Sequence, residues 1–109
     1  MKVEIRTKIW LEVEGHPFCH GKAALLSAIQ QHGSIRQAAR QLRMSYRRAW
    51  EYIRDLEASL QFTVVDTQAG GTRGGGAHLT PRGIALLDTY QAVHERVAEA
   101  VSTHGATAI

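Results

Sequence analysis

The sequence has only one cysteine, Cys19, among its 109 residues. An intramolecular disulfide is therefore excluded, and the composition suits a reducing compartment. No apolar run approaches the ~20 residues that a helix needs to cross a bilayer. Residues 1–15 include basic side chains but not the continuous apolar segment of a secretory signal peptide. These absences predict a cytoplasmic protein without a membrane-spanning segment.

Proline is also scarce, with two residues, and hydrophobic residues make up 44% of the chain. This composition argues against disorder, and the length corresponds to one domain, 1–109. The net charge of +3 permits an acidic partner without requiring one. Arginine, which suits bidentate contact with phosphate and guanine, carries most of the central positive charge, at Arg36, Arg40, Arg43, Arg47, Arg48, Arg54, Arg73 and Arg82.

Hydrophobic periodicity predicts a mainly helical domain with a small β component. Apolar residues alternate with polar ones between Val3 and Val13, which predicts an N-terminal strand and turn within 1–20 that buries one face. Trp10 is the aromatic exception on the polar side. Helical spacing predicts three helices within 22–61, a β-hairpin over 62–79 and a long C-terminal helix over 80–104.

Cap residues support these helix boundaries. Gly33 is placed to end the first helix, and Ser34 and Ser45 are placed as N-caps of the next two. Thr80 precedes Pro81, a favourable first residue for the long helix. The second and third helices, joined by a tight connection, form a candidate helix-turn-helix.

The third predicted helix begins Ser45-Tyr46-Arg47-Arg48. In a helix-turn-helix, the first turn of the second helix must reach base edges in the major groove, and adjacent arginines suit that task. The glycine-rich hairpin tip GGTRGGG, residues 70–76, carries Arg73 and suits close approach to a phosphate strand as a wing. A nucleotide-phosphate loop is disfavoured because no Lys-Ser/Thr follows and the segment joins strand to strand.

Two segments, GSIRQAARQLRMSYRRAWEYIRDLEASL and GGTRGGGAHLTPRG, resemble the N-terminal winged helix-turn-helix domain of the ModE family of molybdate-responsive transcriptional regulators. More remotely, they are similar to the LysR-type DNA-binding domain. The resemblance covers roughly residues 20–95, with GSI-x-x-AA, MSY-x-x-AW and GGGA-x-LT-x-x-G as its most specific pieces. It implies a regulator of double-stranded DNA whose first strand and long helix help to build a homodimer. No counterpart of the molybdate-binding domains is recognised in the 109 residues, so we expect a form that lacks them and assign no effector.

The expected DNA-binding residues are Ser34, Arg36, Ser45, Tyr46, Arg47, Arg48, Arg54 and Arg73. For several of these residues, a purely structural role is the alternative to DNA binding. Arg47 has Glu51 four residues later, a spacing typical of a solvated surface ion pair. Tyr46 continues the apolar stripe and is expected partly in the core, and Trp50 is expected within it.

Other functions find less support in the sequence. His16, Cys19 and His20 lie in one turn without a second cluster at ligand spacing, although a partner subunit could supply further metal ligands. No nucleophile and base are arranged for catalysis, so we expect neither an enzyme nor a cofactor. The main alternative is a winged-helix protein-interaction or accessory module in a metalloenzyme pathway, and a third is a metal-sensing repressor. Arginines at both the helix start and the wing tip favour DNA.

Overall fold

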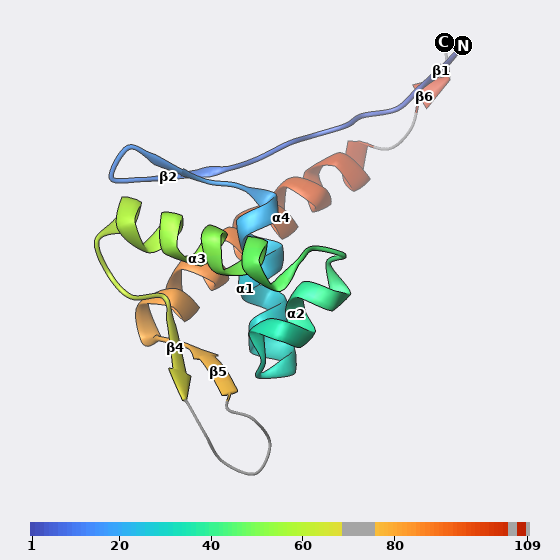
Figure 1. Ribbon diagram of the computed structural model, residues 1–109. Coiled ribbons are helices and arrows are strands. Elements are labelled where there is room, and N and C mark those ends of the chain that lie inside the picture. The colour runs from blue at the N-terminus through green and yellow to red at the C-terminus, as the bar shows by residue number, and fades with distance from the viewer. Residues whose placement is uncertain (69–75, 105–106, 109) are drawn as a thin grey trace.

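The computed structural model describes residues 1–68, 76–104 and 107–108. In chain order its elements are β1 (Lys2–Val3), β2 (Leu11–Val13), β3 (His16–Phe18), α1 (His20–His32), α2 (Ile35–Gln41), α3 (Tyr46–Leu60), β4 (Val65–Gln68), β5 (Gly76–Leu79), α4 (Pro81–His104) and β6 (Thr107–Ala108). Helices α1, α2 and α3 form the body, and the β4–β5 hairpin extends from it (Figure 1). This arrangement confirms the predicted helix-turn-helix followed by a wing.

The helix boundaries follow from local caps. Gly33 ends α1 in the left-handed region at φ 66°, as predicted. The Ser34 and Ser45 hydroxyls each accept a hydrogen bond from the backbone N–H three residues later, at 3.2 and 3.0 Å. Helix α1 begins at His20, two residues before the expected start, and no side chain caps it. The connection between α2 and α3 is closed by Arg43, whose φ is 56°.

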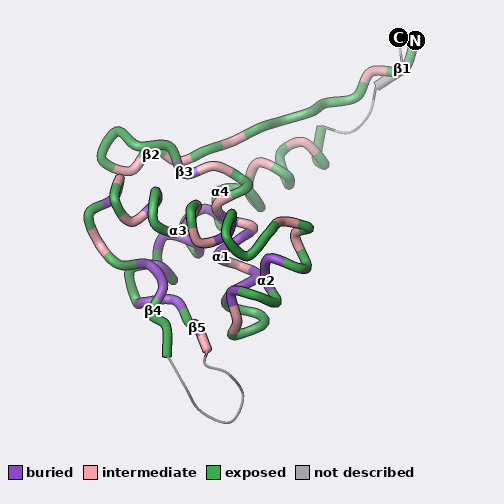
Figure 2. Tube along the Cα trace, in the orientation of Figure 1, coloured by how far each residue is buried: buried purple, intermediate pink, exposed green. Residues whose placement is uncertain are grey.

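One hydrophobic cluster holds the body together. Ala38 and Ala39 are buried, so α2 packs closely against α1 and α3 as their small side chains predict. Buried residues gather where α1, α2, α3, the wing and the first half of α4 meet (Figure 2). The largest fully buried side chains are Phe18, Leu25, Leu26, Ile29, Ile53, Val64 and Leu87.

The predicted N-terminal strand is wrong over most of its length. Two short pieces of it form strands. Leu11–Val13 pairs with His16–Phe18, and Lys2–Val3 pairs with Thr107–Ala108 near the chain ends. Residues 4–10 belong to no strand and run extended from the paired chain ends toward β2 (Figure 1). Ile5 is 40% exposed, so the expected buried face does not form there. Alternation supplies an apolar side, but a strand also needs a neighbour to satisfy its backbone hydrogen bonds.

Helix α4 is packed only along its first half. Its buried residues are Gly83, Leu86, Leu87 and Tyr90, and no later residue of the helix is buried. Tyr90 meets Phe18 edge-on, with ring centroids 5.7 Å apart. Burial raises the pKa of the Tyr90 phenol above its ordinary value, and the nearby Cys19 acts in the same direction. The second half of α4 projects away from the body (Figure 1).

Candidate nucleic-acid interface

The first turn of α3 presents two adjacent arginines. The Arg47 side chain is 91% exposed, and its Nε lies 3.3 Å from the Glu51 carboxylate. The second carboxylate oxygen of Glu51 lies 3.8 Å from Nη1 of Arg48. The predicted ion pair with Glu51 therefore forms, but an exposed pair of this kind contributes little to stability. Both guanidinium groups stay accessible to an acidic partner.

Arg48 is held more closely than Arg47. Its Nη2 donates a hydrogen bond of 3.3 Å to the Tyr52 hydroxyl, and its Cζ lies 4.7 Å from the centre of the Tyr52 ring. The hydrogen bond to Tyr52 raises the pKa of Arg48 above its ordinary value. Tyr52 was not among the expected site residues. The four-residue spacing of an arginine and a tyrosine on a helix was the available signal.

A second set of contacts joins α2 to α3. The Arg36 Cζ lies 4.4 Å from the centre of the Tyr46 ring, and Tyr46 meets Trp50 edge-on at 6.3 Å. Arg54 lies over the other aromatic member, with its Cζ 5.6 Å from the centre of the Trp50 ring. We call Arg36, Tyr46, Trp50 and Arg54 the arginine–aromatic row. It places cations at both ends of an aromatic pair.

The row corrects two expectations. Trp50 is half-buried and only packs against the core, although the sequence pattern predicts a core residue. Tyr46 is exposed, so it contributes less to the core than its position in the apolar stripe suggests. Both side chains therefore lie at the edge of the apolar stripe and not within the core.

A groove of about 760 Å³ runs between the helix-turn-helix and the wing. Helix α2 and its cap contribute Ser34, Arg36 and Arg40, and α3 contributes Tyr46 and Trp50. The wing contributes the residues that flank its tip, Thr67, Gln68, Gly76 and Ala77. Polar and positively charged side chains therefore line a concave surface beside the accessible turn of α3. Arg40 and Trp50 in this groove were not among the expected site residues.

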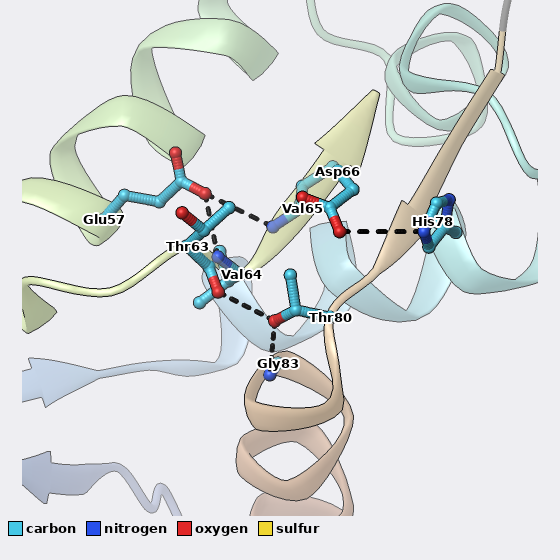
Figure 3. Close-up of polar contacts among 8 residues, drawn as sticks. All are labelled: Glu57, Thr63, Val64, Val65, Asp66, His78, Thr80 and Gly83. Carbon is cyan, nitrogen blue, oxygen red and sulfur yellow. Dashed lines mark hydrogen bonds and ion pairs between the residues drawn. The ribbon is translucent and has the colours of Figure 1, made fainter. Parts of the chain in front are cut away.

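The base of the wing is tied to the helices by buried or half-buried hydrogen bonds (Figure 3). The Glu57 carboxylate accepts from the backbone N–H groups of Val64 at 2.8 Å and Val65 at 3.2 Å. The Thr80 hydroxyl donates to the Thr63 carbonyl at 2.7 Å and accepts from the Gly83 N–H at 3.0 Å. These contacts orient the strands of the wing with respect to α3 and α4.

The wing also contacts the turn before α2. The Ala77 N–H donates to the Gly33 carbonyl at 2.9 Å. An added Cβ at Gly76 would lie 3.4 Å from the same carbonyl, which is ordinary contact. The start of β5 is thus fixed against the α1–α2 connection, on the side of the groove that carries Arg36. The wall of the groove and the helix-turn-helix form one structural unit.

The structure brings most of the expected site residues to this region. Arg36, Tyr46 and Arg54 join the arginine–aromatic row, and Ser34 lines the groove. Arg47 and Arg48 are exposed at the start of α3 and are not among the residues that line the groove. The hydroxyls of Ser34 and Ser45 are engaged as helix caps. Arg73 and most of the GGTRGGG tip lie outside the described residues.

The histidine and cysteine residues gather no metal site in the part of the chain that the structure describes. Among those residues, no three His, Cys, Asp or Glu side chains lie close enough together to hold an ion. The His20 and His94 rings are 6.4 Å apart, and His94 stacks on Tyr90. No described helix combines the length and apolar character of a membrane span.

The fold and the interface define a winged helix-turn-helix domain of the kind found in DNA-binding regulators. The model of the bacterial regulatory helix-turn-helix proteins of the lysR family matches residues 22–84. That match covers more than half of the chain, and the chain belongs to this family. The winged helix-turn-helix class is the one predicted from the helix-turn-helix and the wing, and the LysR-type domain is the more remote of the two resemblances in the sequence.

Individual relatives agree with the predicted resemblance to ModE. The chain is 42% identical over 82 residues to the molybdenum-pterin-binding protein MopB of Rhodobacter capsulatus, covering 75% of this chain and 30% of that protein. It is 42% identical over 69 residues to the transcriptional regulator ModE of Yersinia pestis, covering 63% and 26% of the two chains. The chain thus spans less than a third of the length of these relatives.

A solved structure confirms the fold. The crystal structure of the CbnR_DBD-DNA complex superposes with a TM-score of 0.58 and 22% identity, covering 75% of this chain and 88% of that chain. At this level of identity the likeness concerns the arrangement of helices and wing alone.

Proposed function

We propose that this domain is a sequence-specific DNA-binding transcriptional regulator that acts on double-stranded DNA. The main support for this proposal is that the exposed first turn of α3 lies beside a groove lined by Arg36 and Arg40. Helix α3 enters the major groove with Arg47 and Arg48 toward base edges. The groove between α2 and the wing receives the adjacent phosphate strand.

The remaining residues take supporting roles in this proposal. Tyr46 and Arg54 flank the reading turn, and the helix N-termini capped by Ser34 and Ser45 offer backbone N–H groups to phosphates. Arg73, outside the described residues, is proposed to contact the backbone or the minor groove from the wing. A cytoplasmic location is part of this proposal, because the family consists of bacterial regulators and a bacterial chromosome lies in the cytoplasm. The words "molybdenum-pterin-binding" describe the relative, and we propose no effector for this chain.

We also propose that the protein acts as a homodimer. The support is the uncovered apolar surface of the N-terminal segment and of α4: Trp10 is 53% exposed, Val93 is 38% exposed, and Val97 and Val101 are only half-buried. The 1–109 chain would then consist of one DNA-binding domain with α4 as its dimerisation helix. Two copies bound at half-sites one helical turn apart add their binding energies, which a single small module needs.

The test measures binding to fluorescent duplexes selected from a random library, in a series of salt concentrations. We expect log Kd to change linearly with log salt concentration, because phosphate contacts release counterions. Arg47→Ala or Arg48→Ala is expected to weaken binding to the selected sequence by about 1–3 kcal/mol where that arginine reads a base. If neither variant differs from the wild type on selected DNA, α3 is not the reading helix. A wild-type protein that binds no duplex at low salt contradicts the proposal and favours a protein-interaction module.

A further inference from the structure

The two adjacent arginines of α3 are held in different ways. Arg47 has one charged neighbour, Glu51, and almost the whole of its side chain is exposed. Arg48 contacts the Tyr52 hydroxyl and ring at the same time, and its side chain is 59% exposed. The difference arises from the sequence, because Tyr52 stands one turn after Arg48, whereas the corresponding residue after Arg47 is Glu51.

Tyr52 is itself a fixed support. It is half-buried and packs against the hydrophobic core, so its ring does not move freely with the solvent-exposed side chains. A guanidinium that stacks on this ring and donates to its hydroxyl has fewer accessible orientations than a free arginine. Arginine has five N–H donors in a planar fork. Tyr52 accepts from Nη2, and Glu51 lies 3.8 Å from Nη1, too far for a hydrogen bond, so N–H groups of the fork remain available to a base. Guanine presents O6 and N7 to such groups in the major groove.

We propose that Tyr52 is a positioning residue, which orients the Arg48 guanidinium for bidentate recognition of one guanine. This inference rests on the proposed function, since it concerns how the same α3 surface discriminates between sequences. Tyr52 needs no contact with the DNA in this role. By restricting Arg48 before binding, it reduces the conformational entropy that Arg48 loses when it contacts a base. Its effect is therefore confined to the base pair that Arg48 reads.

The test compares the base preferences of six proteins: wild type, Arg48→Ala, Arg47→Ala, Tyr52→Phe, Tyr52→Leu and the double variant that combines Arg48→Ala with Tyr52→Leu. Each is incubated with random 20-bp duplexes, and sequencing of the bound fraction gives the relative affinity for each base at each position. Arg48→Ala is expected to remove a guanine preference of about 5- to 100-fold at one position. Tyr52→Leu is expected to reduce the preference at that same position by about 3- to 10-fold.

Tyr52→Phe separates the two contacts and protects the test against misfolding. It keeps the ring and its packing but removes the hydroxyl that accepts from Arg48, so the guanine preference is expected between those of wild type and Tyr52→Leu. Arg47→Ala is the matched control, because its loss is expected to leave this position unchanged. In the double variant, Tyr52→Leu is expected to have no further effect at the guanine position once Arg48 is alanine.

Two results overturn the inference. The first is a set of base preferences for both Tyr52 variants that matches the wild type. The second is an equal loss of affinity for all sequences, which indicates a structural role for Tyr52 alone. Wild-type protein that binds no duplex removes the proposed function, and the inference with it. If the wild-type protein has clear base preferences and the Tyr52 variants share them, only the inference is overturned and the proposed function stands.

Discussion

The Glu57 carboxylate accepts a hydrogen bond of 2.8 Å from the backbone N–H of Val64, and so α3 holds the start of the wing. In the sequence, Glu57 reads as an interruption of the apolar stripe of α3. The structure gives that interruption a function, because the same oxygen also reaches the next N–H of the chain. Orientation of the wing thus depends on a side chain from the helix that is proposed to read DNA.

Replacement of Glu57 by alanine is expected to destabilise the fold by about 1–3 kcal/mol, because two half-buried N–H groups lose their acceptor. Glu57→Gln retains an amide oxygen as acceptor and is expected to cost less. The free energy of unfolding in urea provides the measurement. Asp55→Ala, an exposed position on the same helix, serves as control and is expected to stay within about 0.5 kcal/mol of wild type. Equal stability of Glu57→Ala and wild type would contradict the structural role of this carboxylate.

Alanine substitutions at two glycines, Gly83 and Gly21, are expected to change the stability of the protein in opposite directions. An added Cβ at Gly83 would lie 2.5 Å from the Val64 carbonyl oxygen, so α4 packs closely against the start of the wing. Gly83→Ala is expected to destabilise the protein by about 1–3 kcal/mol despite the higher helix propensity of alanine. Gly21→Ala, in α1 with no atom near the added Cβ, is expected to stabilise by up to about 1 kcal/mol. Thermal unfolding of the two variants checks both signs, and a neutral or stabilising Gly83→Ala would refute the close packing.

Much of the body could be predicted because local rules and long-range packing agree there. Ser34 and Ser45 are good N-caps in isolation and remain so in the fold, and the alanines of α2 predict its close packing correctly. The segment GGGA-x-LT-x-x-G can also be interpreted from local rules, as a glycine-rich hairpin followed by the helix cap Thr80. Only the coordinates show why the last glycine of that motif, Gly83, has to lack a side chain.

What could not be predicted depends on partners distant in sequence. Strand formation around Ile5 requires a neighbouring strand, and alternation alone contains no information on whether one exists. Trp50 lies at the border of the apolar stripe, where burial depends on how α2 and the wing are placed. The contact of Arg48 with Tyr52 has a local signal at i and i+4, but that spacing fits an ordinary surface pair equally well.

The buried phenol of Tyr90 predicts a loss of stability at alkaline pH. Its pKa in the folded protein is raised above the ordinary value of 10.0, so the folded state favours the neutral form. The contribution is fully present below about pH 10 and is lost as pH rises through the folded pKa, because the unfolded chain ionises first. We expect the stability difference between wild type and Tyr90→Phe to shift against the wild type above about pH 10. Urea unfolding at pH 8 to 11 measures this shift, and a constant difference would contradict it.

The groove between α2 and the wing predicts a distinct signature for Arg36 and Arg40. If these residues contact phosphates, Arg36→Ala and Arg40→Ala should weaken binding to selected and unselected duplexes by similar factors. Each should also reduce the slope of log Kd against log salt concentration by about 1, because one phosphate contact releases about one counterion. Arg96→Ala, exposed in the second half of α4 and not part of the groove, removes the same charge and is expected to leave the slope unchanged on a duplex with one half-site, where dimerisation does not contribute. Equal slopes for all three variants would place the phosphate strand outside this groove, whereas a sequence-dependent loss in Arg36→Ala would make that residue a reader of bases.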